Sequence, residues 1–86
     1  MHDTFLLKRI SESLRELCNA NSITRVMRLQ IITSQNSHIQ HDNLYEQLLI
    51  DHNGVVGEWT EIIIERQDIE RLTAVIESVE GETLEK

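Results

Sequence analysis

The chain has 86 residues, enough for one small domain and too few for two. Its formal net charge of −7 argues against nucleic acid or an anionic membrane surface as a partner. The single cysteine, Cys18, excludes an internal disulfide and any zinc site built from several cysteines. No signal peptide or long apolar segment is visible, so we expect a cytoplasmic protein.

Apolar residues recur at helical spacing near the start of the chain. They predict a first helix that is capped by Asp3 or Thr4 and ends in a turn at residues 19–22. Charged residues occupy the other face, so the apolar stripe should be buried. Cys18 belongs to this stripe, and we therefore expect a buried structural thiol. The stripe consists of Leu6, Leu7, Ile10, Leu14, Leu17 and Cys18.

Residues 23–33 are typical of a strand, because Met27, Leu29 and Ile31 alternate with polar residues. This alternation predicts one buried face and one solvated face. A polar loop follows at residues 34–40.

A second helix is expected from Asp42, which can cap it, to Asn53-Gly54, where glycine suits a left-handed stop. His52 near its end is in a position that the helix dipole favours. Its apolar side consists of Leu44, Leu48 and Leu49.

Residues 55–66 form a second extended segment, in which Thr60, Ile62 and Ile64 share one face. Ile63 interrupts the polar face of this segment, as it would if another element covered that face.

The sequence of residues 68–80 is compatible with two kinds of secondary structure, a helix or a strand. The spacing of their apolar residues predicts a helix capped by Asp68 and stopped by Gly81. The β-branched residues between Leu72 and Val79 are also typical of a third strand. We therefore expect an α+β fold: two helices packed on a small mixed β-sheet of two to three strands, with a C-terminal strand or third helix. A single domain should cover residues 1–86, with an ordered core to residue 80 and an acidic tail over 81–86.

The first three residues, Met1-His2-Asp3, could chelate a metal ion. A bulky second residue should preserve the initiator Met, which leaves a free α-amine beside an imidazole. That amine, the His2 ring and the backbone nitrogens of His2 and Asp3 could surround one square-planar cation, a donor set suited to Ni(II) or Cu(II). The alternative is that His2 is a frayed, solvated residue.

A second candidate metal site is formed by His38, His41 and Asp42. If the second helix began early, both rings could share a face and bind zinc or nickel together with the carboxylate. The alternative is that all three are polar residues of a loop near a helix cap.

The order of these segments resembles the nickel-binding domain of the HypA/HybF family, accessory proteins for nickel insertion into hydrogenase and urease. Members of that family begin Met-His-Glu and run straight into a helix, as the chain does after Met1-His2-Asp3. Their first strand reads Val-x-Leu-x-Ile-Gly, and residues 27–32 read Met-Arg-Leu-Gln-Ile-Ile. The resemblance spans about residues 1–65, and in its last segment the matching residues are Gly54, Glu58, Ile64 and Glu65.

This resemblance implies a protein that holds Ni(II) through Met1, His2 and Asp3. The recipients it implies are hydrogenase or urease maturation proteins such as an accessory GTPase. The chain also departs from the family, because Asp3 replaces a glutamate and Ile32 replaces a glycine. It lacks the two Cys-x-x-Cys pairs of the family zinc module, so no structural zinc is expected. In the family, the chain returns from that module as one more strand, so a strand at residues 72–79 is as well supported as a helix.

We do not expect an enzyme, because the sequence shows neither a nucleophile-base arrangement nor a phosphate-binding loop. The first functional hypothesis is a nickel-delivery protein. The alternative is a non-enzymatic interaction module that keeps the fold and has lost nickel delivery. Such a module would bind a partner, or another copy in a homodimer, through a sheet edge or Trp59, which stands where the family has glycine.

Overall fold

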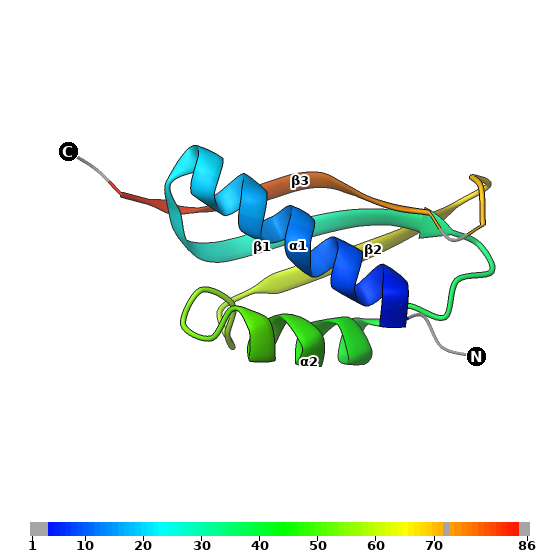
Figure 1. Cartoon of the computed structure of the whole chain (residues 1–86), viewed down its shortest axis with the longest axis horizontal. Coiled ribbons are helices and arrows are strands. Elements are labelled where there is room, and N and C mark those ends of the chain that lie inside the picture. Colours follow the sequence, from blue (N-terminus) through cyan, green and yellow to red (C-terminus); the bar gives the residue numbers. More distant parts are fainter. Residues whose placement is uncertain (1–3, 72, 85–86) are drawn as a thin grey trace.

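The computed structural model describes residues 4–71 and 73–84, and these residues form two helices and three strands. One mixed sheet has the strand order β2-β1-β3, with β2 parallel and β3 antiparallel to β1. In Figure 1, α1 crosses the sheet over β1 and β3, and α2 lies beside β2. The expected α+β class is confirmed, and the C-terminal element is a strand. The elements are α1 (Thr4–Asn21), β1 (Ile23–Ser34), α2 (His41–Asp51), β2 (Glu61–Gln67) and β3 (Ala74–Thr83).

One face of the sheet packs against both helices. In the strand register, Leu29 lies between Ile62 and Val79, and Ile31 lies between Ile64 and Ile76. Leu29 and Ile31 are fully buried because β1 is the central strand and both helices cover this face. The helices contribute Leu6, Ile10, Leu14 and Cys18 from α1, and Leu44 and Leu48 from α2.

Helix α1 follows the predicted stripe and extends further than expected. The turn predicted at residues 19–22 is helical up to Asn21, whose side-chain amide donates a hydrogen bond of 2.9 Å to the Leu17 carbonyl oxygen. Ser22 then takes a left-handed conformation with φ 57°, which ends the helix and directs the chain into β1.

A β-bulge changes which residues of β1 enter the core. The alternation in the sequence placed Met27 on the buried face, but Met27 is 38% exposed and Val26 is fully buried. The register with β3 shifts between Val26 and Arg28, which rotates the start of the strand relative to its centre. Gly81 lies opposite this shift, and a Cβ atom there would be 1.9 Å from the Arg25 carbonyl oxygen.

Helix α2 begins at His41, one residue before the expected cap at Asp42. The N-cap is Gln40, whose backbone N–H donates to the side-chain oxygen of Asn43 at 2.9 Å. The helix ends as expected before Gly54, which has φ +90°. Of its three leucines, Leu49 is 36% exposed and the other two are fully buried.

The second extended segment is a regular strand only from Glu61, not from Val55 as the sequence predicted. Val55 and Val56 instead form a turn after α2, in which both backbone N–H groups donate to the His52 carbonyl oxygen. Val56 is nevertheless fully buried, so its apolar side chain contributes to the core without belonging to a strand.

Strand β3 continues to Thr83, into the segment that was expected to be an acidic tail. Its last residues pair with the start of β1, with Glu82 opposite Arg25 and Thr83 opposite Ile23. The acidic composition predicted solvation correctly for the Glu82 side chain, which is exposed. It could not predict that the backbone of the same residues completes the sheet.

Candidate functional site

The predicted nickel ligands Met1, His2 and Asp3 lie outside the described residues. The structure therefore neither brings these three residues together nor separates them. Helix α1 begins at Thr4, and Leu6 in its first turn is 3% exposed. The segment that would bind nickel is thus followed directly by a helix that is anchored in the core.

The second predicted site, formed by His38, His41 and Asp42, is not assembled in the structure. The His41 ring stacks on Tyr45 with a centroid distance of 5.9 Å, and its Nδ1 atom lies 3.2 Å from Oδ1 of Asp42. In the described part of the chain, no group of three or more His, Cys, Asp or Glu side chains is arranged to hold a metal ion. His41 and Asp42 are the first two residues of α2, and His38 lies in the loop that precedes it.

Cys18 is 7% exposed and belongs to the core, as the sequence predicted. Burial raises the pKa of the Cys18 thiol, because a thiolate would lose hydration there. The neutral thiol is a weak nucleophile and a poor metal ligand.

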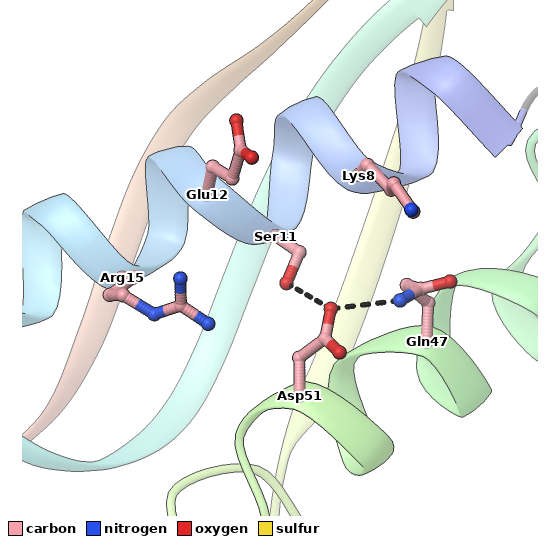
Figure 2. Close-up of a pocket in the computed structure, with 6 residues that line it drawn as sticks. All are labelled: Lys8, Ser11, Glu12, Arg15, Gln47 and Asp51. Atoms are coloured by element: carbon pink, nitrogen blue, oxygen red, sulfur yellow. Dashed lines mark hydrogen bonds between the residues drawn. The ribbon is translucent and has the colours of Figure 1, made fainter.

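The two helices are joined by a polar cluster of Ser11, Asp51 and His52, which the sequence did not reveal. The Ser11 hydroxyl lies 2.6 Å from Oδ2 of Asp51 and 3.1 Å from Nε2 of His52. Ser11 is 2% exposed and His52 is 8% exposed, whereas Asp51 is exposed. Figure 2 shows the cleft above Asp51, with the carboxylate between Ser11 and Gln47.

The sequence did contain one signal for this cluster. Ser11 lies four residues after Leu7 and three before Leu14, so it is a polar residue within the apolar stripe of α1. A hydroxyl group buried at such a position requires a hydrogen-bond partner. The partners come from a segment about forty residues away, as their sequence separations of 40 and 41 show, and local periodicity cannot identify them.

Hydrogen-bond directions show that this cluster is not a catalytic triad. His52 Nε2 lies 3.0 Å from the Ser11 carbonyl oxygen, which can only accept, so Nε2 must carry a proton. The Asp51 carboxylate can only accept as well, so it receives the hydroxyl proton of Ser11. A general base needs a free lone pair directed at the nucleophile, and His52 Nε2 has none here. The cluster therefore connects the helices and does not activate Ser11.

Asp51 accepts a second hydrogen bond, of 2.8 Å, from the Gln47 amide. Hydrogen bonds from Ser11 and Gln47 lower the pKa of the Asp51 carboxyl, with smaller effects of His52 and Arg15 in the same direction. Asp51 is thus held as an anion at the end of α2. Lys8 and Arg15 project from α1 on either side of Ser11 (Figure 2).

Trp59, which the sequence analysis also singled out, packs against its own loop and against Arg25 of β1. The Arg25 guanidinium lies over the indole at 4.2 Å from the ring centroid, a cation–π contact. The ring also lies against Gly57, where a Cβ atom would be 2.5 Å from an indole carbon. Trp59 borders a shallow groove that is also lined by Tyr45 and Leu49 of α2.

No model of a known protein family matches the chain, and no curated protein matches it either. Among the described residues, neither helix has the length and apolar character needed to cross a membrane.

Proposed function

We propose that the protein is a nickel-binding accessory protein that holds Ni(II) at its N-terminus and passes it to another protein. The observation that carries this proposal is the sequence Met1-His2-Asp3 directly before a helix that begins at Thr4. The ligands would be the Met1 amine, the His2 ring and the backbone nitrogens of His2 and Asp3. In this proposal nickel is a cargo, and the resemblance to the HypA/HybF family gives its direction of transfer.

The start of α1 at Thr4 fits this donor set. The first N–H groups of a helix have no acceptor within the helix, and the His2 and Asp3 nitrogens precede even those. Deprotonating them for metal binding would therefore break no hydrogen bond inside α1. Nickel affinity should rise with pH, because the amine, imidazole and amide donors must all lose protons.

One further point supports the proposal. The third strand, β3, lies where the resemblance places a returning strand, although helical periodicity suggested a helix. We propose a cytoplasmic location and, as recipients, hydrogenase or urease maturation proteins such as an accessory GTPase.

The alternative function is a non-enzymatic interaction module that has kept the fold and lost nickel delivery. The observation that favours it is the lack of both Cys-x-x-Cys pairs, since only Cys18 is present. This alternative, with or without a homodimer, predicts that the native protein binds Ni(II) no better than a protein whose N-terminus is blocked.

The deciding experiment is a Ni(II) titration of tag-free protein whose intact mass shows Met1 at the terminus. We expect one Ni(II) per chain with the absorption band of a square-planar complex, lost in His2→Ala and retained in a His38→Ala/His41→Ala control. Acetylation of the Met1 amine removes that donor and should weaken binding by at least about tenfold, with an unchanged melting temperature. Equal affinities of the native and acetylated proteins would exclude amine ligation and favour the interaction module. Loss of binding only in the double variant would move the site to the loop.

A further inference from the structure

The face of the sheet opposite the helices is not covered by any described element. Side chains alternate between the two faces of a strand, so residues 28, 30 and 32 of β1 point away from the core that holds Leu29 and Ile31. Each lies in a row with its partners on β2 and β3. The three rows are Glu61, Arg28 and Glu80; Ile63, Gln30 and Ser78; and Glu65, Ile32 and Val75.

Three β-branched aliphatic side chains lie on this open face: Ile32, Ile63 and Val75. Val75 is 50% exposed, and Ile32 and Ile63 are partly buried. No described element covers these three side chains. None of the three belongs to the core cluster or packs against it. Ile63 is the residue whose position in the sequence suggested a covering element, and the described part of the chain supplies none.

Acidic side chains share this face with the aliphatic ones. Glu61 and Glu65 lie on β2, and Glu80 lies on β3 across from Arg28. The only cation in the three rows is Arg28, whose Nε lies 3.5 Å from Glu61 Oε1. The open face therefore carries three aliphatic side chains, one on each strand, and a net negative charge, which favours a partner with the opposite charge.

A second copy of the chain fits this face poorly. A two-fold axis parallel to the strands would place Glu61 against Glu80 and Arg28 against Arg28. An axis across the strands would place Glu61 against Glu65. Both arrangements would bury like charges against each other, which is costly in an interface.

The dimensions of the face suit a single helix. Three strands spaced by about 4.8 Å span about 10 Å, close to the diameter of an α-helix with its side chains. We propose that the open face binds an amphipathic helix of a partner protein, with an apolar stripe against Ile32, Ile63 and Val75 and Lys or Arg residues on its flanks. This site does not depend on nickel, and it differs from the sheet edges and from the Trp59 groove.

The test uses two synthetic helical peptides with the same leucine stripe, one flanked by Lys and Arg and the other by Glu. Their binding to the full chain is followed by fluorescence anisotropy, and NMR spectra of the ¹⁵N-labelled protein locate the site. We expect saturable binding of the basic peptide that weakens as salt increases, and at least about tenfold weaker binding of the acidic peptide. Amide shifts should centre on residues 28–32, 61–65 and 75–80.

The variant Ile63→Thr/Val75→Thr keeps the β-branched shapes and removes apolar surface, so it should weaken basic-peptide binding by at least about tenfold. The matched control is Ile50→Thr on α2, where Ile50 is 77% exposed, and it should bind like the wild type. Val75→Thr alone serves if the double variant melts at a lower temperature. All variants should keep the Ni(II) affinity of the wild type, which separates this proposal from the nickel site.

Several results would overturn the proposal. One is that the basic peptide shows no saturable binding, and another is that both peptides bind equally well. A third is that the amide shifts are confined to the helices or to the Trp59 groove. A wild-type dimer in sedimentation that Ile63→Thr/Val75→Thr converts to a monomer would assign the face to a second copy instead.

Discussion

The polar contact between α1 and α2 allows a quantitative test, in which Ser11 is replaced by Ala. The change removes only the hydroxyl group, which is buried and donates to Asp51 over 2.6 Å. No partner is left unsatisfied, because His52 Nε2 keeps the Ser11 carbonyl oxygen and Asp51 keeps the Gln47 amide. The expected loss is therefore that of one hydrogen bond, without the larger penalty for an orphaned buried group.

The magnitude follows from three contributions. A hydrogen bond to a charged acceptor contributes about 1.5–3 kcal/mol, and the exposure of Asp51 places this one near the low end, at about 1.5 kcal/mol. Alanine is a better helix former than serine, which returns about 0.5 kcal/mol. The cavity left by one oxygen atom is negligible. Ser11→Ala should thus lower the free energy of unfolding by about 1 kcal/mol and the melting temperature by about 4–8 °C.

The assay is urea unfolding of four proteins: the wild type, Ser11→Ala, Asp51→Ala and the double variant. The double-mutant cycle cancels the helix-propensity difference, so it should give a coupling energy of about 1.5 kcal/mol at neutral pH. The pKa of Asp51 is lowered in the folded state, so its stabilisation is complete above the pKa of the unfolded chain. That stabilisation is lost as the pH falls through the lower pKa of the folded state, and the coupling should fall with it.

A coupling energy near zero at neutral pH would contradict the assigned hydrogen-bond directions. It would mean that the Ser11 hydroxyl donates to His52 and that Nε2 carries no proton. In that case Ser11 would be expected to react with a serine-directed fluorophosphonate probe. With the directions derived above, the native protein should remain unlabelled by this probe.

Three further predictions concern single positions. Gly81→Ala should lower the free energy of unfolding in urea by about 2–3 kcal/mol, because its Cβ would overlap the Arg25 carbonyl oxygen, and a full-stability variant would show that β3 can move away. Gly57→Ala should displace Trp59 and shift its fluorescence emission to the red at a cost of about 1 kcal/mol, whereas unchanged emission would contradict the contact. Cys18 should react with a thiol reagent much more slowly in the native protein than in urea, since it is buried and its thiol has a raised pKa; equal rates would show that α1 opens readily.

The C-terminal element shows what local periodicity can and cannot decide. Ile69, Val75 and Ile76 have helical spacing, yet residues 74–83 form a strand. Pairing with the central strand places Ile76 opposite Ile31 and buries part of its side chain against the core. A helix at this position would leave that edge of β1 without backbone partners. The choice therefore depends on a contact between distant segments, which the sequence pattern does not contain.

The start of β1 differs from its expected alternation for a comparable reason. Strict alternation requires an undisturbed ladder, and the close approach of Gly81 to Arg25 interrupts it. Val26 then enters the core in place of Met27. Met27, Leu29 and Ile31 are correctly predicted as strand residues, and the buried face is correct from Leu29 onward. The error is limited to the segment next to the bulge.

The same contrast between local and distant contacts applies to the functional surfaces. The buried stripe of α1 and the end of α2 before Gly54 follow from spacing and turn chemistry. The Ser11–Asp51–His52 cluster depends on how α1 packs against α2, which no local pattern specifies. Ile63 is intermediate, because its position within the strand predicted that something covers it but could not say what. In the folded chain that residue faces away from both helices, and the acidic side chains beside it favour the basic partner helix proposed above.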